Sequence, residues 1–352
     1  MAQPPGGAGQ MAGNSGVYLQ SLYELQVLGT EASERALETN EAGAIYAVKA
    51  ADVNASTGPG QWQAYDIWFR APRFENGLKT GDARLTAFWN GVLIHNDVAI
   101  PGPTGSRAGG GEPGASPVQL GPVRLQDHAS QAEGSVRFRN AWIAPLDEHN
   151  VTAGGWRDLA AATGADGLPV GWSVRGGAAD FRVENGEVVG TARPNTLNTF
   201  LVTDAEFDDF ELLLEFKQHP ALNSGVQVRS QVIGGFDHRD GGLRGPQVEL
   251  DPTDRAYTGG IYDEQRRGWL ASLIDAPYAR RAYKQGDWNR LRIVVIGPVI
   301  RTWINGVPAA EVFDAMDTGG HIALQVHSVS EIKEPMQVRF RNIRVRPLAV
   351  GD

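Results

Sequence analysis

The chain has 352 residues, a formal net charge of −9 and no cysteine. The acidic balance argues against nucleic-acid binding, which needs a basic face. The lack of cysteine excludes disulfides, thiolate catalysis and cysteine-ligated zinc. Hydrophobic residues make up 41% and charged residues 21% of the chain, as in ordinary globular proteins, and no apolar run is long enough to span a bilayer. A chain of this length predicts about two domains.

The first half of the chain is a series of short strand-like runs. Residues 1–16 form a Gly-, Pro- and Ala-rich segment without the basic and apolar regions of a signal peptide. The runs that follow are rich in β-branched and aromatic residues and are bounded by turn residues, which predicts β-strands. They are residues 16–28, 63–71, 83–94, 123–128 and 136–146. Residues 31–43 are expected to hold one or two helical turns. The Gly-rich residues 105–116 are expected to be a flexible loop, because no strand-to-helix pattern frames them as a phosphate-binding loop.

The second half continues in the same style. Its strand-like runs are residues 181–190, 210–218, 223–229, 246–251, 290–306, 321–328 and 337–348. Residues 268–283 are expected to include a helical turn, and residues 238–242 and 278–288 to form surface loops. Since no long stretch shows a helical period, the predicted fold class is all-β, as a sandwich or jelly roll.

Blocks of sequence recur in the same order in the two halves. The matched pairs are NSGVYLQ (14–20) with NSGVQVR (223–229), GAIYAV (43–48) with GGIYDE (259–264), GQWQAYDIWFRA (60–71) with GDWNRLRIVVIG (286–297), FWNGVLI (88–94) with WINGVPA (303–309), VRLQDHAS (123–130) with IALQVHSV (322–329), and VRFRN at both 136–140 and 338–342. YELQVL (23–28) and PQVELD (246–251) match more loosely. We therefore expect two copies of one unit, residues 1–148 and 149–352. The first copy is expected to be N-terminally incomplete, because residues 155–222 have no counterpart before Asn14.

This order of blocks resembles the DUF1080 family, also called the 3-keto-disaccharide hydrolase domain. The resemblance implies a concanavalin A-like (LamG-like) jelly-roll β-sandwich in two tandem copies. It also implies cleavage of the glycosidic bond of 3-keto-glycosides or 3-keto-disaccharides, by hydrolysis or by β-elimination, with a glycoside or oligosaccharide as partner. Family members are typically exported, so a periplasmic, secreted or cell-surface location is implied.

Strand alternation predicts which side chains share the face opposite the core. In residues 210–216, for example, Phe210, Leu212, Leu214 and Phe216 share one face and are expected in the core. If the strands of the second copy lie in one sheet, the polar face carries Lys217, Arg229, Gln247, Glu249, Asp251, Tyr262, Gln325 and His327. The matching blocks of the first copy carry Gln20, Glu24, Gln26, Tyr46 and His128. A polar outer face is common to all sandwiches, but the Gln, Arg, His and Tyr content favours a sugar site.

A 3-keto group acidifies the neighbouring C2 hydrogen, so elimination across C1–C2 needs a base, an acid and a group that holds the enolate charge. Glu249 or His327 is the predicted base and Tyr262 or His327 the predicted acid. Arg229 or Lys217 is the predicted oxyanion partner. Direct hydrolysis would instead use Glu249 and Asp251 as a carboxylate pair. Gln247, Gln325 and Trp288 are predicted to bind substrate, although Trp288 lies in a repeated block and also fits a structural role.

Three alternatives remain open from the sequence. A divalent metal ion held by Glu249, Asp251 and His327 is possible, although their spacing is not diagnostic. The chain could be a non-catalytic, lectin-like carbohydrate-binding protein, because fold does not dictate function. It could also be a cell-surface interaction protein without selective sugar affinity. The titratable groups on one face favour the enzyme, with the second copy as the catalytic one.

Overall fold

The computed structural model describes residues 10, 13–104, 121–128, 136–145, 151–234, 242–332 and 334–350. The expected loop at 105–116, nearly all of that at 238–242 and most of residues 1–13 lie outside these ranges. The chain forms two compact units, Met1–Ile143 and Ala144–Asp352. Among the described residues, no helix is long and apolar enough to cross a membrane.

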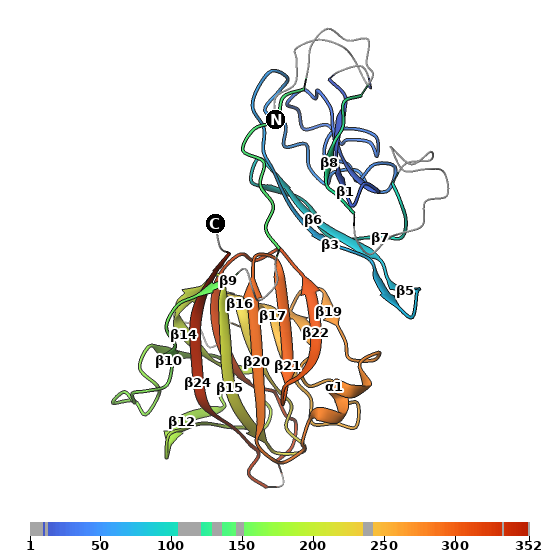
Figure 1. Ribbon diagram of the computed structural model, residues 1–352. Helices are drawn as coiled ribbons and strands as arrows, with labels where there is room; N and C mark the ends of the chain where they lie inside the picture. Colours follow the sequence, from blue (N-terminus) through green and yellow to red (C-terminus); the bar gives the residue numbers. More distant parts are fainter. Residues whose placement is uncertain are drawn as a thin grey trace. The chain divides into compact units, whose positions relative to one another are not determined.

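The second unit contains two antiparallel sheets (Figure 1). The nine-stranded sheet contains, in spatial order, β12 (Asp180–Glu184), β13 (Glu187–Thr191), β24 (Gln337–Val350), β15 (Phe210–Gln218), β20 (Asn289–Ile296), β21 (Val299–Ile304) and β22 (Val307–Phe313), with β9 (Val151–Ala153) and β10 (Arg157–Asp158) also paired to β24. The seven-stranded sheet contains β11 (Trp172–Gly176), β14 (Thr199–Phe207), β23 (Gly320–Val326), β16 (Ser224–Val232), β17 (Leu243–Leu250), β18 (Ile261–Glu264) and β19 (Gly268–Ala271).

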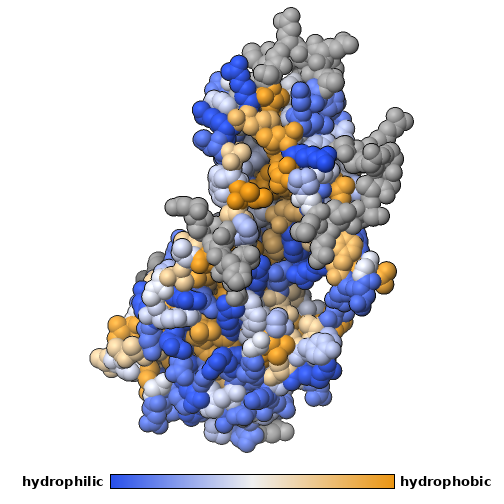
Figure 2. Space-filling model, in the orientation of Figure 1, coloured by the Kyte–Doolittle hydropathy of each residue, from blue (hydrophilic) through white to orange (hydrophobic). Residues whose placement is uncertain are grey.

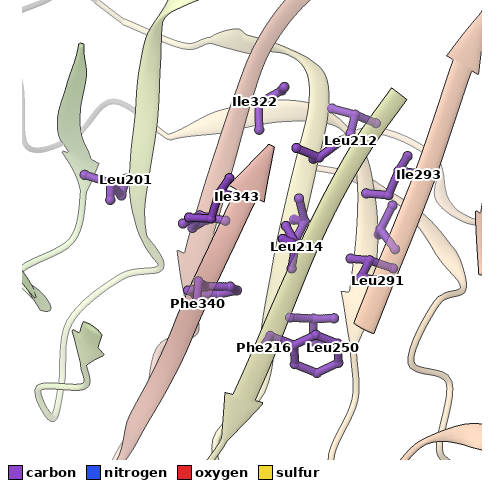
Figure 3. Packing of buried hydrophobic residues seen from close by; sticks show 14 of the residues in the cluster. Leu201, Leu212, Leu214, Phe216, Leu250, Leu291, Ile293, Ile322, Phe340 and Ile343 are labelled. Carbon is purple, nitrogen blue, oxygen red and sulfur yellow. The ribbon is translucent and has the colours of Figure 1, made fainter. Parts of the chain in front are cut away.

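One hydrophobic core lies between these two sheets. Phe210, Leu212, Leu214 and Phe216 of β15 are all buried, as their alternation predicts. They pack in the same cluster as residues of the other sheet such as Leu250. Figure 3 shows Leu212, Leu214 and Phe216 of β15 with Leu250 in this core. The predicted all-β, concanavalin-like sandwich is confirmed.

The helical predictions have mixed outcomes. A single short helix, α1 (Pro277–Ala282), lies within residues 268–283, as expected. The helical turns predicted in residues 31–43 are wrong, because the described chain has no helix there. The carboxylate of Glu41 accepts a hydrogen bond from the backbone N–H of Glu38 and pairs with Arg35. These side-chain contacts stabilise a local turn in place of a helix.

The first unit is built from shorter sheets. One sheet contains β2 (Tyr23–Val27), β1 (Ser15–Leu19) and β8 (Arg124–Leu125), in this spatial order. A second contains β3 (Tyr65–Arg70), β6 (Ala83–Trp89) and β7 (Val92–Ile100), and a third pairs β4 (Arg73–Glu75) with β5 (Leu78–Gly81). The order β2-β1-β8 repeats the order β17-β16-β23, and β3-β6-β7 repeats β20-β21-β22. The sequence repeat is therefore also a repeat of strand pairing.

The two VRFRN segments differ in structure. Residues 338–342 lie in β24, which pairs with β13 and β15. Residues 136–140 form no strand, and the prediction of a strand there is wrong. The described part of the first unit contains no strands that correspond to β13 and β15. A strand-forming sequence without neighbours to satisfy its backbone does not form a ladder.

Candidate functional site

Two rows of side chains cross the outer face of the seven-stranded sheet, opposite the core. Strand register places them in line, since neighbours in a row are directly paired residues of adjacent strands. The first row is Phe200, Gln325, Gly225 and Glu249. The second row is Ala323, Gln227, Gln247, Tyr262 and Trp269. The predicted placement of Gln247, Glu249, Tyr262 and Gln325 on one face is confirmed, and we call this surface the Glu249 face.

Glu249 is held by two amide donors. Asn223 Nδ2 donates to its Oε1 at 2.7 Å, and Gln247 Nε2 donates to its Oε2 at 3.0 Å. Gln247 is oriented in turn by Gln227, whose Nε2 donates to Gln247 Oε1 at 2.8 Å. Gly225 makes room for this arrangement, because a β-carbon placed on it would lie 2.3 Å from Gln247 Cδ. The glycine is therefore needed for space, and the glutamate is fixed in position.

Two carboxyl groups of this face are perturbed. Burial raises the pKa of Glu249 above its ordinary value, although the hydrogen bonds from Asn223 and Gln247 oppose the shift. Burial also raises the pKa of Glu264, which accepts a 3.4 Å hydrogen bond from Asn198 Nδ2. The charge of Glu249 raises the pKa of Glu264 further, and the nearby His327 lowers it. Perturbed carboxyls gathered on one face are typical of catalytic sites.

Gln325 and His327 supply hydrogen-bonding groups on this side. Gln325 is fully buried, and among the described residues neither its amide oxygen nor its amide nitrogen has a hydrogen-bond partner. Only Gly225 stands between it and Glu249 in the first row. The half-buried His327 makes a 2.8 Å contact from Nδ1 to the carbonyl of Ser328. A carbonyl only accepts, so Nδ1 carries the proton and Nε2 is left for a ligand.

Lys217 does not lie on the Glu249 face, and its predicted placement there is wrong. Trp288, which was predicted to bind substrate, does not lie on this face either. Lys217 belongs to β15, and Trp288 packs under the guanidinium of Arg341 from β24 at 3.8 Å. Both strands belong to the nine-stranded sheet. Alternation within a strand was read correctly, but it does not reveal which sheet the strand joins.

Arg229 is also displaced from the predicted face. The pairing of β16 with β17 shifts between Gln227 and Gln231, and Arg229 has a positive φ of 47°. This bulge turns the side chain away, so that its guanidinium donates to the carbonyls of Asp208 and Gly297 and to Asp209. With 2% exposure, Arg229 joins loops of the structure and is not available to a substrate.

Asp251 is occupied by the loop that follows β17. Its Oδ1 accepts hydrogen bonds from Thr253, and its Oδ2 accepts from Arg255 Nε at 2.8 Å and from the backbone N–H of Tyr257. Burial raises its pKa, but these hydrogen bonds outweigh burial and hold the pKa below its ordinary value. Both carboxylate oxygens of Asp251 are therefore engaged by its own loop, which leaves Glu249 without the predicted carboxylate partner.

The predicted metal ligands do not form a site. Within the described ranges, the structure brings no three His, Cys, Asp or Glu side chains together in a way that could hold a metal ion. Glu249, Asp251 and His327 thus do not make up a ligand set.

Sequence reasoning missed three polar residues of the Glu249 face. Asn223 lies in the NSG block that recurs at Asn14, and this repetition could have indicated it. Glu264 has the same strand parity as Tyr262 and could have been found by alternation. No sequence pattern indicated Asn198, because it lies in a loop that has no counterpart in the first copy.

The first unit keeps the strand pairing of this face but changes its side chains. Gly16 pairs with Gln26 and Tyr18 with Glu24, where the second unit pairs Gly225 with Glu249 and Gln227 with Gln247. The carboxyl group has therefore moved by two residues along the strand. Burial raises the pKa of Glu24 to about 7, against a lowering hydrogen bond from Tyr18. Of the other predicted counterparts, Gln20 keeps a positive φ of 51° like Arg229, Tyr46 donates its backbone N–H to the carbonyl of Glu24, and His128 is exposed.

The chain matches the family described as the 3-keto-alpha-glucoside-1,2-lyase-like domain over residues 3–144 and again over residues 152–346. It belongs to this family. The two separate matches confirm the tandem copies expected from the repeated blocks. None of the curated proteins matches the chain.

Several solved structures resemble part of this family member. A protein from Parabacteroides distasonis described as a "putative glycosyl hydrolase" is 18% identical, with a TM-score of 0.39 over 55% of this chain and 95% of that one. A Bacillus subtilis protein with a galectin-like fold is 12% identical, with a TM-score of 0.41 over 57% and 97%. The carbohydrate-binding module CBM66 from Bacillus subtilis is 12% identical, with a TM-score of 0.33 over 49% and 94%.

Proposed function

We propose that the second copy, residues 149–352, cleaves the C1–O bond of 3-keto-glycosides by elimination across C1–C2. The observation that carries the proposal is the first row of the Glu249 face. A buried carboxyl with a raised pKa lies there beside Gly225, which has no side chain, and Gln325, whose amide has no partner among the described residues. A substrate bound at this row would have the Glu249 carboxylate as a base and the Gln325 amide as a hydrogen-bond donor, with the Gln247 side chain occupying the space that Gly225 leaves between them.

Glu249 acts as the general base in this mechanism. Its carboxylate removes the C2 proton, and the electron pair of the C2–H bond moves towards the C3 carbonyl to give an enolate. A raised pKa makes the carboxylate a stronger base than an exposed glutamate. Each of its oxygens accepts one hydrogen bond, from Asn223 or Gln247, and keeps a second lone pair for the proton.

The enolate then expels the leaving group. Its electrons restore the C3 carbonyl and form the C1=C2 double bond while the C1–O bond breaks. The departing oxygen takes a proton from the Tyr262 hydroxyl, or from Nε2 of His327 when both ring nitrogens carry a proton. Gln325 replaces Arg229 and Lys217 as the proposed donor to the enolate oxygen, since the structure places neither cation on this face. Water added later to the double bond would give the net products of hydrolysis.

The description of the matched family as a 1,2-lyase supports elimination over direct displacement by water. The contacts of Asp251 support it as well, because both of its oxygens are engaged by Thr253, Arg255 and Tyr257 of its own loop, whereas direct hydrolysis needs a second carboxylate that reaches the substrate or the attacking water. Family resemblance also leads us to propose a location outside the cytoplasm, which fractionation of the source cells would test.

The experiment is incubation of the full chain with a chemically prepared 3-keto-glucoside, following release of the aglycone. We expect release by the wild type, and a loss of about 10²–10⁴-fold in kcat for Glu249→Gln, the range for removal of a general base. Glu187→Gln is the matched control, because Glu187 lies on the other sheet in an ion pair with Arg339. It should keep the wild-type rate.

Two outcomes would contradict the proposal. Full activity of E249Q would eliminate Glu249 as the base. Calorimetric binding of the intact 3-keto-glucoside without aglycone release would instead support the lectin-like alternative. Detection of the unsaturated sugar by mass spectrometry, without incorporation of water, would distinguish elimination from hydrolysis.

A further inference from the structure

A trough lies on the outer face of the nine-stranded sheet, with the core of the second unit between it and the Glu249 face. Its deeper part, about 500 Å³, is lined by Arg290, Arg292, Trp303 and Arg344. An adjoining hollow of about 350 Å³ is lined by Trp288 and Arg341, and both parts share Glu215. Strands β24, β15, β20 and β21 of this sheet face the viewer in Figure 1, and hydrophilic residues predominate on this side of the unit in Figure 2.

A β-bulge interrupts the regular pairing of β15 with β24 at this place. Leu213 of β15 pairs with Arg344 of β24, but Glu215 pairs with Arg341, so β24 has one extra residue between these pairs. The extra residue is Asn342, whose φ of 53° is in the left-handed region. Bulges bend a strand and redirect its side chains, often beside binding sites. The bulge lies at the hollow, because Asn342 lines it together with side chains of the neighbouring strands.

The trough has an excess of positive charge. Arg292 and Arg344 flank Leu213, and Arg290 and Arg341 flank Glu215, on the strands to either side of β15. Glu215 is engaged by Arg341 Nε at 2.7 Å. Arg290 and Arg344 are exposed, and no carboxylate among the described residues pairs with either of them. Two guanidinium groups are thus available to an anion, on a protein whose net charge is −9.

Aromatic rings border the same trough. The Arg292 guanidinium lies 4.2 Å from the centre of the Trp303 ring, and that of Arg341 lies 3.8 Å from the centre of the Trp288 ring. Carboxylates of β15 already engage both of these guanidiniums, since Arg292 Nε donates to Glu211 Oε1 at 2.6 Å and Arg341 Nε to Glu215 Oε2 at 2.7 Å. Arg290 and Arg344, which pair with no described carboxylate, have the same planar donor geometry, and it matches a carboxylate through two parallel hydrogen bonds.

We propose that this trough binds an oligosaccharide that carries carboxylate groups. The combined hollow has room for more than one sugar ring, the unpaired arginines match the carboxylates, and the half-buried tryptophans offer apolar surface to sugar C–H groups. An acidic peptide fits less well, because extended peptides bind sheets by pairing with a free edge strand. The trough instead lies over interior strands, from β24 across β15 to β20. The site is independent of the proposed lyase activity.

Isothermal titration calorimetry of the full chain with tetragalacturonate tests the proposal, since this sugar carries one carboxylate per ring. We expect binding that weakens at least tenfold when the carboxylates are methyl-esterified, and at least tenfold in the double variant Arg290→Ala/Arg344→Ala. Both side chains are exposed, so the variant should keep the wild-type unfolding temperature. The matched control is Arg182→Ala/Arg193→Ala, which removes the same charge from arginines already paired with Glu184 and Asp180.

The proposal would be overturned by absence of binding, by equal binding of the methyl ester, by an equal loss of affinity in the control variant, or by equal binding of a hexaglutamate peptide. Equal affinity for a sulfated oligosaccharide of the same length would overturn the assignment to carboxylates. Binding of tetragalacturonate by E249Q with wild-type affinity would support a site separate from the Glu249 face.

Discussion

Glu24 is a buried carboxyl, and no nearby cation contributes to the shift of its pKa. It is 3% exposed, and burial raises its pKa from 4.5 to about 7. The folded state therefore keeps a proton that the unfolded state releases between these two pH values. Because stability falls with rising pH wherever the native state binds more protons, ionisation of Glu24 costs the fold up to about 3 kcal/mol above pH 7.

Glu24→Gln removes this titration while keeping the shape of the side chain. Below about pH 4.5 the carboxyl is protonated in both states, so the wild type and E24Q should differ little in this respect. As pH rises from 5 to 8, the free energy of unfolding of the wild type should fall relative to that of E24Q, and then level off. Thermal unfolding of the full chain across this pH range measures the difference. A difference that does not change with pH would contradict the raised pKa.

The strand β24 shows how one sequence acquires different structures in the two copies. Phe340 in its VRFRN segment is fully buried and belongs to the core between the two sheets. Phe138 occupies the matching place in the first copy, where it is half-buried and outside any strand. The neighbouring strands supply both the backbone partners and the burial, so the five residues alone do not determine the strand.

The pair Phe340→Ala and Phe138→Ala tests this dependence on context. Removing a fully buried phenylalanine costs about 3–5 kcal/mol, so F340A should strongly destabilise the second unit. F138A should cost about 1 kcal/mol or less, as expected for partly exposed sites. Urea unfolding of both variants gives the comparison. Equal losses would show that Phe138 is packed as Phe340 is.

Strand alternation predicted the site as far as local geometry allows. It identified Gln247, Glu249, Tyr262 and Gln325, because alternation depends only on the strand itself. It failed at Arg229, where a bulge breaks the alternation, and at Lys217, whose strand joins the other sheet. Both failures arise from pairing between distant segments, which a local pattern does not contain.

Loops were beyond the reach of the same reasoning. Asp251 follows directly after a strand, and continuing the alternation by one residue put it on the predicted face. The structure shows its carboxylate closing a turn with Thr253 and Arg255. The order of the repeated blocks, by contrast, predicted the tandem copies and their shared strand pairing, because that inference used the whole chain.

The buried hydrophobic residues of the described chain form three clusters, and none of them is shared between the two units. The large cluster contains residues of the second unit from Trp172 to Val345, and another contains residues of the first unit from Leu19 to Ile100. Neither cluster includes a described residue of the other unit. Units that do not share a core are expected to unfold independently, and a single two-state transition then fails to describe the chain.

Differential scanning calorimetry of the full chain should therefore resolve two transitions, and the variants above assign them. E24Q should shift only the transition of the first unit, and F340A only that of the second, because each substitution lies within one unit and the units share no hydrophobic cluster. At pH 5 and at pH 8 alike, the transition of the second unit should have the same midpoint temperature in E24Q as in the wild type. One transition with equal calorimetric and van't Hoff enthalpies, shifted by both substitutions, would instead show that the two copies fold as a single cooperative unit.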